Sequence, residues 1–154
     1  MEKIIFMNTS PNKKGNTYRI GEEILKNVSH DVMQMSDYKI CQYGVVDETD
    51  EIKKVFDSIK SVETLVIGAP VYWYTVGGIL KTFIDRLYLL PEAVILKGKK
   101  LYLFAQGSAP EQNTKNAIEF LTNRVATLMG MELKGVVTST SDGEEIINKF
   151  INIM

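Results

Sequence analysis

Short apolar runs alternate with longer segments of helical periodicity along the whole chain, and this alternation constrains the fold more than any other feature. The apolar runs are five to seven residues long, rich in β-branched and aromatic side chains, and are predicted to be strands at 3–8, 31–35, 64–69, 100–106 and 132–138. Between and after them, apolar residues recur at a spacing of 3.6 within 20–28, 52–62, 76–87, 118–128 and 146–151. We therefore expect five strand–helix units.

Five such units predict an α/β fold with a parallel sheet, because a parallel strand pair needs a crossover that a helix supplies. Several runs are almost continuously apolar, as in strands covered on both faces. Five units suit an open, flavodoxin-like three-layer sandwich with strand order 2-1-3-4-5 and helices on both faces, since a barrel needs eight. No linker or repeat divides the sequence, so we expect residues 1–154 to form a single domain.

Composition excludes several classes of protein. Apolar residues make up 45% and charged residues 24% of the chain, the range of soluble globular proteins, and no apolar run is long enough to span a membrane. The net charge of −1 favours neither nucleic acid nor an anionic membrane as a partner. Cys41 and His30 are the only residues of their types, so we expect no internal disulfide and no metal site. The N-terminus shows no signal-peptide pattern, and we expect a cytoplasmic location.

In an open parallel sheet, ligands bind beyond the carboxyl ends of the strands, beside the point where strand order reverses. This rule selects three loops before any chemistry is considered: 8–17, 70–78 and 107–113. In the first, "NTSPNKKGNT", hydroxyl and amide side chains precede a predicted helix whose amino end attracts anions. The alternative is that Asn16 and Thr17 simply cap the helix.

The second loop contains three consecutive aromatic residues, Tyr72, Trp73 and Tyr74. Consecutive loop residues cannot all point into a core, so some of this ring surface is predicted to face a planar aromatic ligand. Gly77 and Gly78 follow, and they suit either a close approach of a ligand or turn chemistry. Arg86, further along the helix, is expected to be solvated or at a subunit contact. In the third loop, Gly107 and Ser108 are placed to line the same pocket, whereas residues from Glu111 on are expected to cap a helix.

Two of these segments resemble motifs of a known family. "TSPNKKGNT" resembles the phosphate-loop signature G-S-P-R-x-x-G-N-T, and "APVYWYTVGGILKTFIDR" resembles a segment P-V-Y-W/F followed by L-K-x-F-I-D-R. Both are typical of the flavodoxin-like NAD(P)H-dependent FMN reductases and their iron–sulfur flavoprotein relatives. The resemblance implies an enzyme that transfers a hydride from NAD(P)H through bound FMN to a small-molecule acceptor such as a quinone, a nitroaromatic or free flavin. It also implies a homodimer.

The resemblance further implies which residues bind FMN. Ser10, Asn12, Asn16 and Thr17 would hold the 5′-phosphate, Pro70, Val71, Tyr72, Trp73 and Tyr74 would run along the isoalloxazine ring, and Gly107 and Ser108 would approach it from the fourth strand. No protein side chain is named as catalytic, because the flavin carries the chemistry.

The chain departs from the family pattern at several positions. Thr9 replaces the usual glycine and Asn12 the usual arginine, which removes a charged contact to the phosphate and predicts weaker FMN binding. The stretch "DYKICQYGVVDETDE", where iron–sulfur relatives carry a cysteine cluster, has only Cys41. We therefore expect no cluster, and Cys41 is predicted to be a small buried or half-buried apolar residue.

Three other functions fit the same fold. A flavodoxin-type FMN electron carrier is one, although those chains are strongly acidic and this one is not. A response-regulator receiver is another, but Asn8, Thr9, Ala69 and Pro70 stand where it needs acidic residues. A partner-binding module without catalysis is the third, since fold alone does not determine function.

Overall fold

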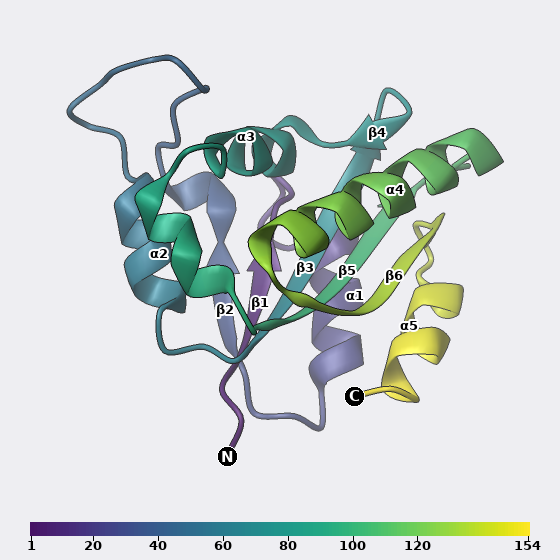
Figure 1. Cartoon of the computed structure of the whole chain (residues 1–154). Coiled ribbons are helices and arrows are strands. Elements are labelled where there is room, and N and C mark those ends of the chain that lie inside the picture. The colour runs from purple at the N-terminus through teal and green to yellow at the C-terminus, as the bar shows by residue number, and fades with distance from the viewer.

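The strands and helices alternate as predicted in the computed structural model, which describes all 154 residues. Figure 1 shows them in chain order, with the sheet running through the middle of the molecule. The bounds are β1 Ile4–Asn8, α1 Asn16–Leu25, β2 Asp31–Gln34, α2 Ile52–Ile59, β3 Thr64–Tyr72, β4 Thr75–Val76, α3 Gly78–Arg86, β5 Lys100–Gly107, α4 Gln112–Met129, β6 Glu132–Thr140 and α5 Glu144–Ile151. Two 3₁₀ segments, Met35–Asp37 and Pro91–Leu96, complete the chain.

The main sheet has the order β2-β1-β3-β5-β6 with every neighbouring pair parallel. This is the predicted 2-1-3-4-5 order, and the flavodoxin-like α/β class is confirmed. The short strand β4, which the sequence pattern did not predict, pairs antiparallel with the end of β3.

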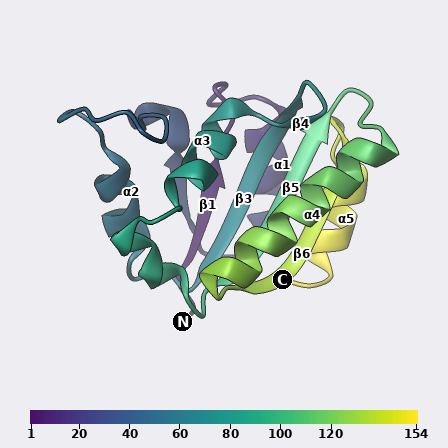
Figure 2. The ribbon, with the colours of Figure 1, turned by 45° about the horizontal axis from the view of Figure 1, so that its top comes forward.

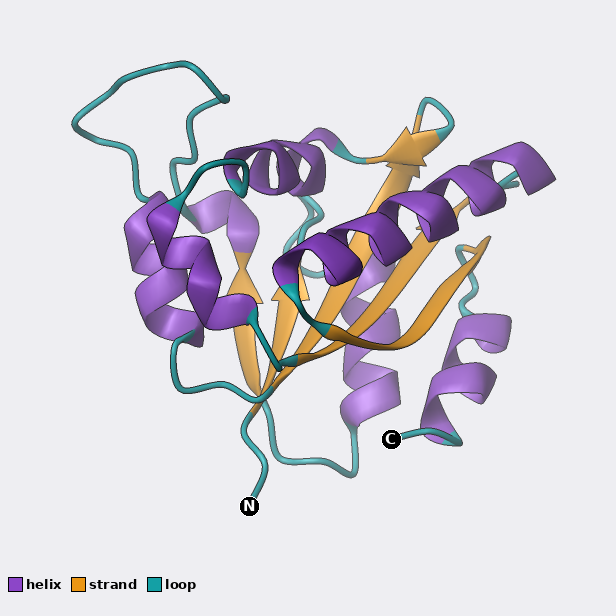
Figure 3. Ribbon diagram, viewed as in Figure 1, coloured by secondary structure: helices purple, strands orange, loops and turns teal.

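Helices cover both faces of the sheet, as Figures 2 and 3 show. On β1 the side chains of Ile5 and Met7 join a cluster with α2, α3 and α4, while Phe6 between them joins a cluster with α1 and α5. This alternation follows from the two-residue period of a strand. Each such buried side chain contributes about 1.5–3 kcal/mol.

Four details of the prediction are wrong. Val76, expected on the helical stripe 76–87, lies in strand β4 instead, and Ile151, expected on the stripe 146–151, is 46% exposed. The strand expected at 64–69 continues to Tyr72, because Val71 and Tyr72 find pairing partners in Val76 and Thr75. Leu128, expected on the inward stripe of its helix, is 68% exposed on the outer side of α4. None of the helices has the length and apolar character needed to cross a membrane.

Candidate functional site

The three predicted loops leave the same edge of the sheet from β1, β3 and β5, which lie side by side. Asn8 at the end of β1 is paired in register with Gly68 on β3, and Pro70 two residues further on is paired with Gln106 on β5. The parallel arrangement therefore brings the carboxyl ends of the central strands together, as expected.

Buried residues at the start of the first loop hold it in place through hydrogen bonds. Asn8, Thr9 and Ser10 are almost completely buried. The Ser10 N–H donates to Asn8 Oδ1 over 3.1 Å, and the Asn12 N–H donates to Ser10 Oγ, also over 3.1 Å. Thr9, at the position where glycine is usual, donates its hydroxyl to the Gly68 carbonyl oxygen over 2.8 Å. These bonds fix the path of the loop to the start of α1.

The amino end of α1 presents unpartnered donors. Gly15 occupies the N-cap position and no side chain caps the helix. The backbone N–H groups of Asn16, Thr17 and Tyr18 donate to no acceptor in the chain. Neither Asn16 nor Thr17 acts as the cap that the alternative interpretation required. Free N–H groups and the positive end of the helix dipole form a site suited to an anion.

Thr17 also has a structural contact. Its hydroxyl oxygen is buried and accepts a hydrogen bond from Gln106 Nε2 over 3.0 Å, which ties α1 to β5. A Cβ on Gly68 would lie 2.8 Å from Thr17 Cγ2, so α1 packs tightly on β3 at this point. Lys13, in contrast, points to the surface and pairs with Asp37 at 2.5 Å.

The aromatic triplet forms the tip of a tight hairpin. Tyr72 ends β3 and pairs with Thr75, which leaves Trp73 and Tyr74 as the two residues of the turn. Both have left-handed backbones, with φ of 47° and 65°. This is the pattern of a type I′ turn, where Asn-Gly is the preferred sequence. Aromatic residues there store about 1–2 kcal/mol of strain each, and such strain concentrates at functional sites.

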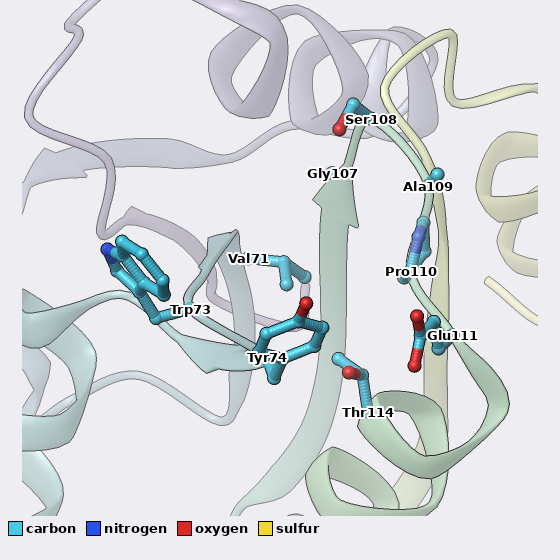
Figure 4. A pocket seen from close by; sticks show the side chains of 9 residues that line it. All are labelled: Val71, Trp73, Tyr74, Gly107, Ser108, Ala109, Pro110, Glu111 and Thr114. Carbon is cyan, nitrogen blue, oxygen red and sulfur yellow. The ribbon is translucent and has the colours of Figure 1, made fainter.

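A pocket of about 320 Å³ lies between this turn and the segment after β5. Figure 4 shows the Tyr74 ring projecting toward the middle of the pocket, with Trp73 on one side and Ser108 to Glu111 on the other. The lining residues are Val71, Trp73, Tyr74, Gly107, Ser108, Ala109, Pro110, Glu111 and Thr114. Gly107 permits a close approach of the two walls, because a Cβ there would lie 3.0 Å from Val71 Cβ.

The pocket contains some of the sequence-predicted site residues and not others. Val71, Trp73, Tyr74, Gly107 and Ser108 line it. The other six predicted residues lie at the same edge of the sheet but outside the pocket: Ser10, Asn12, Asn16, Thr17, Pro70 and Tyr72.

Sequence reasoning missed four lining residues, Ala109, Pro110, Glu111 and Thr114. Glu111 was expected only to cap a helix, and it does stand at the N-cap of α4, but its side chain makes no cap hydrogen bond. Pro110 was the available signal, because a proline keeps the residue before it extended, so the loop after β5 runs on to this point before a helix can begin.

The backbone conformation at positions 77 and 78, after the turn, does not require glycine. Gly77 and Gly78 lack the left-handed φ that Gly44, Gly98, Gly130 and Gly143 show. A Cβ on Gly78 would meet nothing within 4 Å, so the start of α3 faces open space. This speaks against turn chemistry as the reason for Gly78.

Arg86 is neither solvated nor available for a subunit contact, contrary to expectation. Its guanidinium forms an ion pair with Asp50, and the two side chains are only 15% and 12% exposed. It also donates to the Cys41 carbonyl oxygen over 2.9 Å. Burial alone raises the pKa of the Asp50 carboxyl, but bonds from the Ile52 N–H and Arg86 outweigh it and hold that pKa below its ordinary value of 3.8. Arg86 thus anchors the long connection between β2 and α2, in which Cys41 is half-buried as predicted.

Comparison with known proteins places the chain among flavoproteins. Residues 2–143 match a family described as "NADPH-dependent FMN reductase". A protein of Archaeoglobus fulgidus named iron-sulfur flavoprotein is 33% identical over 97 residues. That match covers 54% of this chain and 48% of the relative, so the matched region is about half the length of that protein.

Solved structures share the fold at lower identity. The Trp repressor binding protein from Bacillus subtilis superposes with a TM-score of 0.80 at 21% identity, covering 98% of both chains. An FMN-dependent NADH-azoreductase from Bacillus anthracis, in complex with FMN, gives a TM-score of 0.69 at 11% identity over 98% of this chain and 94% of the other. At these identities the likeness concerns the fold alone.

Proposed function

The chain belongs to the NADPH-dependent FMN reductase family, and from this premise we propose that it is an FMN-dependent oxidoreductase. In this proposal FMN, when bound, takes a hydride from NADH or NADPH and delivers the electrons to a small-molecule acceptor such as a quinone, a nitroaromatic or free flavin. The observation that carries the proposal is the strained aromatic turn facing the 107–114 segment across a pocket, at the edge where α1 begins.

The residues at this edge fit a phosphate monoester. The donor set comprises the three unpartnered N–H groups of Asn16, Thr17 and Tyr18, supported by the Ser10 and Asn12 side chains nearby in sequence. Such a set neutralises an anion without a charged side chain. Asn12 in place of the usual arginine therefore lowers the expected affinity for FMN, but the N–H groups still form a complete phosphate cradle.

The residues around the pocket fit a planar ring system. Trp73 and Tyr74 expose 92% and 65% of their surfaces, which is unusual for such large rings without a partner. Pro70, Val71 and Tyr72 continue this wall, and Gly107 and Ser108 form the opposite one. The backbone N–H groups of Ser108, Ala109 and Glu111 donate to no acceptor in the chain and are available to polar ring atoms. In this arrangement the chain positions the ring, covers it from water and supplies hydrogen bonds where negative charge develops.

We also propose that residues 1–154 act as one FMN-binding domain within a cytoplasmic homodimer. An apolar groove that runs between the Pro91–Leu96 segment and the end of α4 supports the dimer. Leu89, Val94 and Leu128 line it and are 68–79% exposed. Light scattering of the purified protein tests this part of the proposal, and a monomer at all concentrations would contradict it.

The reductase activity is tested by adding NADH or NADPH to the FMN-loaded protein without oxygen. Flavin absorbance near its visible maximum should disappear with at least one of the two donors. If neither donor bleaches the flavin, the reductase proposal fails and an electron carrier is favoured.

The phosphate site is tested by Asn16→Asp, which preserves shape and places a negative charge among the free N–H groups. Repulsion of the phosphate should weaken FMN binding about tenfold or more, while binding of riboflavin, which lacks the phosphate, should be unchanged. Asn116→Asp makes the same change at an exposed position of α4 and should affect neither ligand. Equal losses for FMN and riboflavin would show that the phosphate does not bind at the start of α1.

A further inference from the structure

The pocket contains a single charged group, the carboxylate of Glu111. The other eight lining residues are apolar, aromatic, hydroxyl-bearing or glycine. Figure 4 shows the Glu111 side chain directed alongside Thr114 on the wall opposite Trp73 and Tyr74. Glu111 takes part in none of the eleven ion pairs of the chain. Its charge is therefore not cancelled by a cationic side chain.

The position of Glu111 matters because it precedes the amino end of α4. This helix has 18 residues and no side-chain cap, and the N–H groups of Gln112, Asn113 and Thr114 donate to no acceptor in the chain. A helix end of this kind carries about half a positive elementary charge and attracts anions. The carboxylate adds a full negative charge at the same place. The sum is about half a negative charge, so Glu111 reverses the sign that the helix alone would give the pocket.

The nearest lysine on the same helix does not restore a positive sign. Lys115 lies in a separate surface hollow together with Glu119, Glu145 and Lys149. In that hollow it helps to lower the pKa of the Glu145 carboxyl, after the larger effects of the Ser139 and Lys149 hydrogen bonds. The aromatic faces of Trp73 and Tyr74, on the other wall, also present negative rather than positive potential to a ligand.

We propose that Glu111 is a specificity-determining residue: in the part of the pocket that stays open beside the bound flavin ring, it favours uncharged or cationic planar aromatic acceptors and rejects anionic ones. The inference rests on the proposed function, since it assigns the class of electron acceptor to the same site. It narrows the acceptors to neutral quinones, neutral nitroaromatics and cationic dyes. Sulfonated or carboxylated ring compounds are excluded.

The first test measures binding and needs no turnover. The FMN-loaded full chain is dialysed to equilibrium against three ring compounds of similar size: naphthalene-2-sulfonate, 2-naphthamide and 1-methylquinolinium. The wild type should bind the cation and the amide more tightly than the sulfonate. In Glu111→Gln the preference for the amide over the sulfonate, expressed as the ratio of their dissociation constants, should fall by about 3- to 30-fold. This is the effect expected of one charge some 6 Å from the sulfonate, about 3-fold in bulk water and about 30-fold in a partly desolvated site. Because the helix end is then unopposed, the sulfonate should become the preferred ligand.

Glu119→Gln is the matched control, since it removes a carboxylate from an exposed position two turns further along α4. It should leave all three dissociation constants unchanged. Wild-type protein in rising salt provides a measurement free of any folding defect in the variant. Between about 0.01 and 1 M ionic strength, the discrimination against the sulfonate should shrink as the screening length falls from about 30 to 3 Å.

The second test compares kcat/KM for menadione and for 1,4-naphthoquinone-2-sulfonate with the better nicotinamide donor. The ratio should favour menadione in the wild type and in Glu119→Gln, and should shift toward the sulfonate in Glu111→Gln. If the ratio and the binding preferences are the same in all three proteins, the inference about Glu111 is wrong while the proposed function stands. If NADH and NADPH leave the flavin oxidised, the proposed function is wrong, and the binding experiment alone decides the role of Glu111.

Discussion

The strained turn at Trp73 and Tyr74 predicts a trade-off between stability and flavin binding. Each left-handed residue other than glycine or asparagine costs about 1–2 kcal/mol, so Trp73→Asn with Tyr74→Gly relieves about 2–4 kcal/mol. The new glycine destabilises the folded state by about 0.5–1 kcal/mol, because it has greater conformational freedom in the unfolded chain. Trp73 is 92% exposed, and the third of Tyr74 that is covered contributes about 1.5 kcal/mol. The double variant should therefore be about 1 kcal/mol more stable than the wild type.

The same variant should lose flavin affinity, because both exposed rings of the pocket are removed. Two aromatic contacts at about 0.5–1.5 kcal/mol each correspond to a loss of roughly 5- to 150-fold in FMN affinity. Urea denaturation of the flavin-free proteins measures the stability, and quenching of FMN fluorescence on titration measures the affinity. Trp73→Phe with Tyr74→Phe is the control, since it keeps the rings and the strain and should change neither quantity greatly.

The reasoning would be refuted by a double variant that is at least 1 kcal/mol less stable than the wild type, which would mean that the turn is not strained. It would equally be refuted by full retention of FMN affinity, which would mean that the rings serve another purpose.

Two further predictions concern other parts of the structure. Arg86→Gln leaves the largely buried Asp50 carboxylate unpaired and should lower the free energy of unfolding, measured in urea, by about 3 kcal/mol. Because the folded-state pKa of Asp50 lies below 3.8, the ion pair stabilises the wild type fully above pH 3.8, and this stabilisation is lost as the pH falls through the folded-state pKa. A difference between wild type and variant that persists undiminished in acid would contradict the ion-pair assignment. Gly78→Ala adds a methyl group to open space and should change the free energy of unfolding by no more than about 1 kcal/mol. It should weaken FMN binding, measured by the same fluorescence titration, if the cofactor approaches the start of α3. Unchanged binding would show that no ligand comes close there.

Most of the fold could be predicted from the sequence because its signals are local. A continuous apolar run such as Ile5, Phe6 and Met7 predicts a strand covered on both faces, and a 3.6 spacing such as that of Ile20 and Ile24 predicts a helix. The right-handed crossover then leaves few topologies, and the observed order was among them. The rule for parallel sheets predicted a site at the carboxyl edge without knowledge of any side-chain position.

Other features depend on which distant segments the fold brings together, and no local pattern encodes them. Arg86 meets Asp50 across 36 positions, and Gln106 donates to Thr17 across 89. The left-handed turn at Trp73 arises because β3 continues beyond its expected end and finds a partner in β4. Glu111 became a pocket residue because the turn and the start of α4 face each other in space.

The sequence by itself thus determined the strand order, and it predicted the edge of the sheet that carries the candidate site and the first loop as an anion cradle. Only the tertiary structure decided that two of the three aromatic residues line the pocket and that a carboxylate stands opposite them. The physical reason is that periodicity and helix ends are properties of neighbouring residues, whereas strain, ion pairing and the charge of a pocket are set by contacts between segments far apart in the chain.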